Sequence, residues 1–318
     1  MISLIVAKLA VRDLDKTGST VGKIYTSGSV GSIVGTFATG FFLISWFGTH
    51  TIEWGVALLL IALGLLFLLQ GRWPWLLLAV LILASSTILA SSRGWLHGPC
   101  TRETNYFCIK VQDQEKSGEI VRVLILDRLV HSYSSLEDPT RLVYGYEQVY
   151  AEVTSYQAQR RENLRALFIG GGGYTFPRYM ETIYPDSDIH VIEIDPGVTR
   201  VAHDLLGLAP DSTVVSYNED ARMFLKREPN GQYDLIMGDA FNDFSVPYHL
   251  TTREFNEQVH DWLRDDGLYV VNIIDGAWGE FLRAYTHTLR QTFCYVYLAP
   301  TIDSCVFDKL KSTHLAEL

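Results

Sequence analysis

"RALFIGGGGYTFPRYME", residues 165–181, is the stretch that decides the fold of this chain. An apolar run ends in four consecutive glycines, Gly170 to Gly173, and a helical pattern follows them. Glycine lets the backbone turn sharply and approach a ligand closely. An apolar strand, a glycine turn and a helix in this order predict a cofactor loop of the nucleotide-binding type.

The same alternation continues to the end of the chain. Strand-like runs recur after the loop, each followed by a helical run, at residues 188–194, 212–217, 233–239 and 268–274, and a run at 295–299 closes the series. This pattern predicts a Rossmann-like α/β domain with a doubly wound, mostly parallel sheet over residues 151–318. Strand-like runs before it predict a small β domain over residues 97–150.

Acidic side chains stand where the predicted strands end. Glu193 ends the second strand, 23 residues after Gly170, which is the spacing at which an acid meets ribose hydroxyls in dinucleotide folds. Asp220 follows the third strand and Asp239 ends the fourth. The alternative for Asp195 and Asp220 is helix N-capping, and Asp239 has a turn residue as its alternative.

This acid-rich edge bears on the choice of cofactor. Thr175 occupies the third glycine position of the G-x-G-x-x-G pattern. Several carboxylates would repel a pyrophosphate, but they suit ribose hydroxyls, an exocyclic amine and a cationic sulfonium. The pattern therefore favours an S-adenosyl ligand over a dinucleotide.

Charge and cysteine content exclude other classes. The net charge is −10, from 26 basic and 36 acidic residues, and no Lys/Arg-rich run is present, so a general nucleic-acid partner is excluded. The four cysteines have no zinc spacing, which predicts no metal. Disulfides joining Cys100 to Cys108, or Cys294 to Cys305, are both left open.

The N-terminal part is apolar. Runs at 24–48, 51–70 and 73–92 are each long enough to predict a transmembrane helix, which makes residues 1–96 a bundle of three spans. Buried core helices are the alternative. The first run has small residues at a four-residue spacing, which predicts close packing inside the bundle or a homodimer face, at Ser27, Gly31 and Gly35.

The orientation of these spans has two conflicting indications. Basic residues before the first span favour an inside N-terminus, which would put the C-terminal domain outside. Adenosyl ligands, however, are made in the cytosol. We therefore expect an integral protein of the inner or plasma membrane, in contact with the lipid bilayer, with its soluble domain facing the cytoplasm.

Several segments resemble motifs of the spermidine synthase family, the aminopropyltransferases, over about residues 104–275. The pairs are "LILDRLVH" with LDG-x-x-Q, "FIGGGG" with GGGDG, "VIEID" with VEID, "NEDARMFL" with GDA-x-x-F, and "YDLIMGDAF" with YD-x-I-x-D. The N-terminal segment "GKIYTSGSVGSIVGTFATGFFLI" resembles the last spans of the membrane-fused branch, the fused MFS/spermidine synthases.

The resemblance implies a cofactor site and a catalytic residue. The donor would be S-adenosylmethionine or its decarboxylated form, with methylthioadenosine as the product. Asp239 aligns with the catalytic aspartate, which orients a substrate amine and accepts its proton. The implied cofactor-binding positions are Gly170, Gly171 and Gly172 for the methionine-derived part, Glu193 for the ribose, and Asp220 with Ala221 for the adenine amine.

The chain also departs from the family motifs. Gly173 replaces the aspartate of GGGDG, and His131 replaces the glutamine of LDG-x-x-Q. The tyrosine of the family's Y-H-E segment falls at Gly145, beside Tyr146 and Glu147. The second acid after the catalytic one falls at Asn242, unless Asp243 takes its place. The substrate-binding candidates are therefore His131, Tyr146, Glu147, Asn242 and Asp243, with a polar strand residue as the alternative for His131.

Taken together, these features predict a membrane-anchored, spermidine synthase-like transferase. It would move an aminopropyl or other alkyl group to an amine-type nucleophile on a small-molecule acceptor, either a polyamine or an amphiphile. The first alternative is an S-adenosylmethionine-dependent methyltransferase. The second is a non-catalytic ligand-binding sensor or transport accessory.

Overall fold

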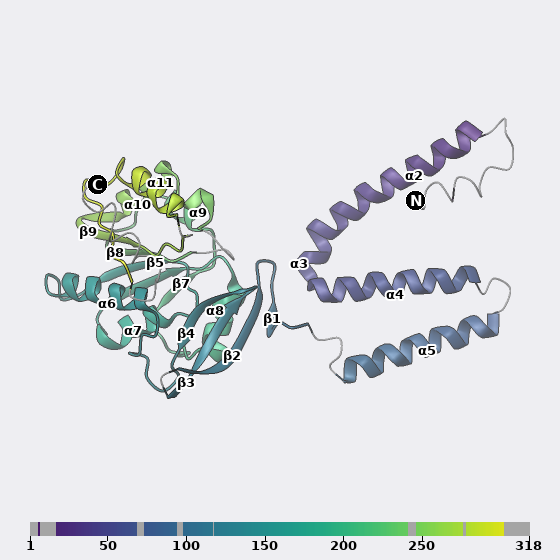
Figure 1. Cartoon of the computed structure of the whole chain (residues 1–318), viewed down its shortest axis with the longest axis horizontal. Coiled ribbons are helices and arrows are strands. Elements are labelled where there is room, and N and C mark those ends of the chain that lie inside the picture. Colours follow the sequence, from purple (N-terminus) through teal and green to yellow (C-terminus); the bar gives the residue numbers. More distant parts are fainter. Residues whose placement is uncertain are drawn as a thin grey trace. The chain divides into compact units, whose positions relative to one another are not determined.

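The computed structural model contains two compact units, Met1–Gly98 and Pro99–Leu318 (Figure 1). The residues that the structure describes are residue 6 and the ranges 17–68, 73–93, 98–116, 118–240, 246–275 and 278–301.

The first unit is helical. Its long helices are α2 (Thr17–Ala38), α4 (Thr49–Leu68) and α5 (Trp73–Ser92). A π-helix, η2 (Thr39–Leu43), and a three-residue helix, α3 (Ile44–Trp46), follow α2.

The expected membrane bundle is not borne out. In the part of the chain that the structure describes, no helix combines the length and the apolar character needed to cross a bilayer. The first expected span, 24–48, is not one α-helix, because its α-helical hydrogen bonding stops at Ala38 and a π-helix begins. Hydroxyl groups also interrupt the apolar surface of α5, where Ser85 and Thr87 bond to backbone carbonyls one turn back. The three-span bundle and the integral inner- or plasma-membrane localisation are therefore wrong.

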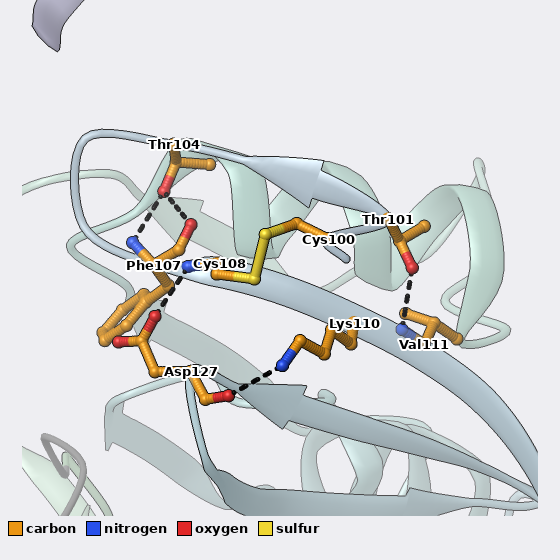
Figure 2. Close-up of a disulfide and its surroundings, with 8 residues drawn as sticks. All are labelled: Cys100, Thr101, Thr104, Phe107, Cys108, Lys110, Val111 and Asp127. Atoms are coloured by element: carbon orange, nitrogen blue, oxygen red, sulfur yellow. Dashed lines mark hydrogen bonds between the residues drawn. A yellow bond between two sulfur atoms is a disulfide. The ribbon is translucent and has the colours of Figure 1, made fainter. Parts of the chain in front are cut away.

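The second unit begins with a small antiparallel sheet. Its strands β1 (Arg102–Glu103), β2 (Cys108–Lys116), β3 (Glu119–Leu126) and β4 (Leu129–Ser134) pair in sequence order. Asp127, with φ 54°, makes the tight turn between β3 and β4, because two-residue hairpins need a positive φ. The disulfide between Cys100 and Cys108 closes the turn from β1 into β2 (Figure 2).

A parallel sheet of five strands follows helix α6 (Gly145–Ala158). The spatial order is β7-β6-β5-β8-β9, so the direction of winding reverses between β5 and β8. Ligands of such sheets bind at this switch point, outside the carboxyl ends of the strands. The strands are β5 (Arg165–Ile169), β6 (Asp188–Ile192), β7 (Val215–Tyr217), β8 (Tyr233–Gly238) and β9 (Leu263–Val271).

Helices cover both faces of this sheet (Figure 1). Along β5, Ala166 and Phe168 pack in one apolar cluster with residues of α6 and α7, and Leu167 and Ile169 pack in another with residues of α9 and α10. This alternation follows from the two-residue period of a strand. The helices are α7 (Thr175–Ile183), α8 (Pro196–Leu205), α9 (Ala221–Leu225), η3 (Tyr248–Leu250), α10 (Arg253–Trp262) and α11 (Glu280–Leu289).

One predicted strand is not formed. Residues 295–299 have no strand pairing, and β9 lies at the edge of the sheet. The alternating pattern of this run is that of a strand, but a strand also needs a neighbour to receive its backbone hydrogen bonds. The side chains of Tyr295 and Tyr297 are accordingly exposed.

Candidate active site

The glycine loop lies at the switch point of the sheet. Gly170 has a φ of +96°, and a Cβ atom there would lie 2.6 Å from the carbonyl oxygen of Asp239, so only glycine fits. Gly171 is similarly restricted by the ring of Tyr174. Gly172, with φ +48°, has nothing within 4 Å of its would-be Cβ and borders open space. The loop thus packs β5 tightly against β8 and leaves one glycine facing outward.

Glu193 follows β6 and turns its carboxylate toward the loop. Its Oε2 accepts a hydrogen bond from the Gly171 amide at 2.8 Å, and its Oε1 accepts one from the Asp195 amide at 2.9 Å. The side chain is buried, and burial raises its pKa, while the backbone amides of Asp195, Gly171 and Gly172 oppose that rise. Glu193 is therefore a buried acceptor held against the glycine loop.

Asp220 and Ala221 lie at the start of α9. Asp220 is the N-cap, and its Oδ1 accepts from the Met223 amide at 3.0 Å. Its Oδ2 lies 3.0 Å from Nε2 of His249, which belongs to η3. The N-capping alternative for Asp220 is thus what the structure shows, and one carboxylate serves both contacts. Ala221 is buried in the core beside it.

Asp239 follows β8 and is held from two sides. Its Oδ2 accepts a hydrogen bond from the Tyr146 hydroxyl at 2.9 Å, and its Oδ1 accepts one from Nδ2 of Asn272 at 2.9 Å. Burial raises the pKa of Asp239 to about 6, and these two hydrogen bonds hold it down. The carboxylate therefore titrates close to neutral pH, as a general base requires.

Unlike Tyr146, Glu147 does not point its side chain at Asp239. Its carboxylate folds back on the start of α6, where Oε2 accepts from the Tyr144 amide at 3.2 Å in a capping box. The side chain is only 2% exposed, and burial raises its pKa to about 8. Glu147 is therefore mostly neutral at pH 7. Tyr144 and Tyr146 pack together, with ring centroids 5.4 Å apart.

The position of the missing family aspartate is filled by another strand. A Cβ atom on Gly173 would lie 1.9 Å from Oγ of Ser132 and 3.2 Å from Oγ of Ser134, both on β4. No side chain fits at 173 unless β4 moves. The candidates Asn242 and Asp243 lie outside the described residues.

A cleft of about 1070 Å³ joins part of these groups. Its walls include His131 on β4, Tyr146 on α6, and Gly172, Asp239 and Asn272 at the strand ends. Glu193 and Asp220 are not among its lining residues. The structure therefore brings the catalytic candidate and three substrate- or cofactor-binding candidates to one cleft, and it places the ribose and adenine candidates beyond that cleft.

Asn272 was not identified from the sequence. It directly follows β9, so it stands at the same sheet edge as Asp239 on the neighbouring strand. Extending the strand-end rule to the fifth strand would have found it. Ser132 was also missed, and no sequence signal indicates its contact with Gly173.

Comparison with known proteins gives consistent matches for this part of the chain. Residues 147–294 match the spermine/spermidine synthase domain family. A polyamine aminopropyltransferase of Vibrio vulnificus is 38% identical over 138 residues, which are 42% of this chain and 44% of that protein. An N-terminal histidine N-methyltransferase of Emericella nidulans is 33% identical over 144 residues, which are 43% of this chain and 25% of that protein.

A solved structure supports the fold. A probable spermidine synthase from Corynebacterium glutamicum superimposes with a TM-score of 0.55 at 24% identity, covering 60% of this chain and 69% of the other. The matches to the curated relatives span less than half of their length. They show the domain and do not show the membrane-fused branch.

Proposed function

Because the chain carries a spermine/spermidine synthase domain over residues 147–294, we propose that it transfers an alkyl group from an S-adenosyl donor to an amine. The donor is S-adenosylmethionine or its decarboxylated form, and methylthioadenosine remains after aminopropyl transfer. The acceptor is a small molecule with an amine, of the polyamine type. The observation that carries this proposal is the Asp239 carboxylate, held between Tyr146 and Asn272 beside the glycine loop.

The residues at the switch point fit an S-adenosyl ligand. The outward-facing Gly172 leaves room for a ligand to approach the backbone. Glu193 is a buried carboxylate next to that loop, and a carboxylate has about four acceptor directions, more than its backbone donors occupy. In the proposed complex Glu193 accepts from the ribose hydroxyls, Asp220 and Ala221 face the adenine amine, and Gly170, Gly171 and Gly172 line the methionine-derived part.

Asp239 supplies the base. A bound sulfonium provides a good leaving group, so the protein's main tasks are to orient the amine and to remove its proton. With a pKa of about 6, Asp239 is mostly ionised at pH 7 and can take a proton from a substrate ammonium. Asp239 also lines the cleft, and the bonds from the tyrosine and the asparagine occupy one acceptor direction of each carboxylate oxygen, which leaves others for a substrate amine.

A second candidate, methyl transfer, has its own support. The family's aspartate of GGGDG is Gly173 here, and β4 occupies the space that its side chain would need. The donor's amino end is therefore bound differently from the family pattern. The likeness to a histidine N-methyltransferase, which covers a quarter of that relative, agrees with this alternative.

Calorimetry on the purified full chain tests the proposal. The ligands are methylthioadenosine, S-adenosylmethionine and decarboxylated S-adenosylmethionine, and we expect the first and one of the other two to bind. Tighter binding of the decarboxylated form supports aminopropyl transfer, and tighter binding of S-adenosylmethionine supports methyl transfer. Absence of binding by all three contradicts the cofactor assignment.

The variant Asp239→Asn separates an enzyme from a ligand-binding sensor. It keeps the shape and one acceptor of the side chain but cannot take a proton. We expect the adenosyl ligand to bind within about threefold of wild type, while turnover falls by about 10²–10⁴. Unchanged turnover with the preferred donor rules out Asp239 as the base.

A further inference from the structure

The turn between β1 and β2 reaches the proposed ribose-binding residue through hydrogen bonds. The Cys100–Cys108 disulfide closes this turn, and Thr104 is its first residue after β1 (Figure 2). The Thr104 hydroxyl accepts from the amides of Tyr106 and Phe107, at 3.2 and 2.9 Å. Its one proton has two acceptors within reach, the Phe107 carbonyl oxygen at 3.2 Å inside the turn and a closer oxygen outside it.

That outside bond goes to Asp195. The Thr104 hydroxyl donates to Oδ2 of Asp195 at 2.6 Å. Oδ1 of the same carboxylate accepts from the Gly197 amide at 2.7 Å, which caps α8. The Asp195 side chain is 1% exposed, so both oxygens depend on these protein donors.

Gly197 makes room for this contact. A Cβ atom on Gly197 would lie 2.3 Å from Cγ2 of Thr104 and 3.4 Å from Cδ1 of Ile109. The φ of Gly197 is not in the left-handed region, so close approach of the turn, and not backbone conformation, requires glycine here. The turn is thus seated directly on the first turn of α8.

The path ends at the glycine loop. The Asp195 amide donates to Oε1 of Glu193, and Oε2 of Glu193 accepts from the Gly171 amide. Thr104, Asp195, Glu193 and Gly171 therefore form one continuous hydrogen-bonded series from the disulfide-closed turn to the loop. The position of the Glu193 carboxylate depends on where the Asp195 backbone is held.

We propose that Thr104 is a positioning residue for Glu193, acting through Asp195, and that the Cys100–Cys108 disulfide holds Thr104 in place. The inference rests on the proposed function, in which Glu193 accepts ribose hydroxyls. Removing the Thr104 hydroxyl leaves a buried oxygen of Asp195 without its donor, and the backbone from 193 to 195 then relaxes around the change. The Glu193 carboxylate is then no longer held in position to accept hydrogen bonds from the ribose hydroxyls, whereas the other contacts to the ligand persist.

The test compares two probes on the full chain by calorimetry: methylthioadenosine and its 2′-deoxy analogue. Thr104→Val keeps the shape and removes the hydroxyl, and Thr104→Ser keeps the hydroxyl. We expect Thr104→Val to weaken methylthioadenosine about tenfold and the deoxy analogue much less, so that the preference for the ribose form shrinks. Thr104→Ser restores the wild-type preference. A general loss of stability would weaken both probes alike.

Two further variants complete the test. Thr101→Val is the matched control, because the Thr101 hydroxyl, just before β1, accepts from the Val111 amide of β2 and takes no part in the series from Thr104 to Gly171. This variant leaves the preference unchanged. Cys100→Ser/Cys108→Ser opens the turn and lowers the preference as Thr104→Val does, and it decides the matter if Thr104→Val does not fold.

The outcomes separate this inference from the proposed function. If wild type binds neither probe, or binds both equally, the assignment of Glu193 to the ribose is wrong. If wild type prefers the ribose form and neither the Thr104→Val nor the double cysteine variant changes that preference, Thr104 does not position Glu193.

Discussion

Tyr146 and Asn272 act on one carboxylate, and their effect on its proton affinity can be measured. Each donates a hydrogen bond to Asp239 and lowers a pKa that burial has raised to about 6. A hydrogen bond to a charged group contributes about 1.5–3 kcal/mol, and one pKa unit corresponds to about 1.4 kcal/mol. We therefore expect Tyr146→Phe and Asn272→Ala each to raise the pKa of Asp239 by about one unit.

The measurement is an NMR titration of the aspartate carboxyl carbons, in which Asp239→Asn identifies the signal. Tyr144→Phe is the matched control, since the Tyr144 hydroxyl donates to the carbonyl of Val130 instead. Equal shifts in Tyr144→Phe and Tyr146→Phe, or none in Asn272→Ala, would show that these hydrogen bonds do not set the pKa.

For this residue, the sequence could predict the position of Asp239 at the sheet edge but not the side chains that donate hydrogen bonds to it. Parallel strands bring their carboxyl ends to one edge, so strand-end acids meet there whatever the detailed packing. The partners depend on side-chain directions that the pattern does not contain. Glu147 shows this limit: it was expected to bind substrate, yet it caps its own helix, because α6 begins at Gly145 and puts Glu147 at the third helical position.

The contact between β4 and the glycine loop explains why residue 173 is glycine. Restoring the family's acid with Gly173→Asp would force a Cβ atom to within 1.9 Å of Oγ of Ser132. Overpacking of this kind costs about 1–3 kcal/mol, and we expect that loss in the free energy of unfolding measured by denaturant titration. Adding Ser132→Gly removes the opposing side chain and recovers most of the loss.

The coupling between the two changes is the informative quantity. Gly172→Asn is the control in the same loop, because position 172 borders open space and asparagine tolerates a positive φ. If Gly173→Asp is as stable as wild type, or if Ser132→Gly adds its own effect without recovery, β4 does not close this position.

Two segments show that the sequence pattern alone does not determine where a strand ends or whether it pairs. Residues 119–133 form one continuous strand-like run in the sequence, but Asp127 adopts a positive φ and divides them into β3 and β4. That hairpin lies within the LDG-x-x-Q-like segment and determines which face of β4 meets the loop. Conversely, the run at 295–299 has the pattern of a strand and no pairing partner. Tertiary hydrogen bonding decides both cases.

For the whole molecule, the parallel sheet follows from the alternation of runs, whereas the three apolar N-terminal runs led to a wrong architecture. Composition alone counts apolar residues. It does not reveal that the first run changes from α-helical to π-helical hydrogen bonding at Thr39. The α/β part was more predictable because several independent signals, namely glycines, acids and strand periodicity, fall in register along it.

The stability of the whole molecule should depend on the proton on Glu147. The pKa of a glutamate in the unfolded chain is 4.5, and burial raises the pKa of Glu147 in the folded protein to about 8. Between these two pH values the folded state therefore holds a proton that the unfolded state has released. Stability therefore falls as pH rises through this window, by up to about 1.4 kcal/mol per pH unit. Asp239 contributes a similar fall only up to about pH 6, and Glu193, whose pKa burial also raises, is common to wild type and variant, so the difference between their profiles from pH 6.5 to 8 reports Glu147.

We expect Glu147→Gln to flatten the stability profile in that interval. Glutamine cannot ionise, and its amide oxygen can still accept the hydrogen bond from the Tyr144 amide that the carboxylate accepts now. Glu152→Gln, an exposed change on the same helix, should leave the wild-type slope intact. Denaturant unfolding at a series of pH values measures the slopes. Parallel curves for Glu147→Gln and wild type would mean that Glu147 is already ionised in the folded protein at pH 6.5, and its burial would then need a positive partner that the described residues around it do not supply.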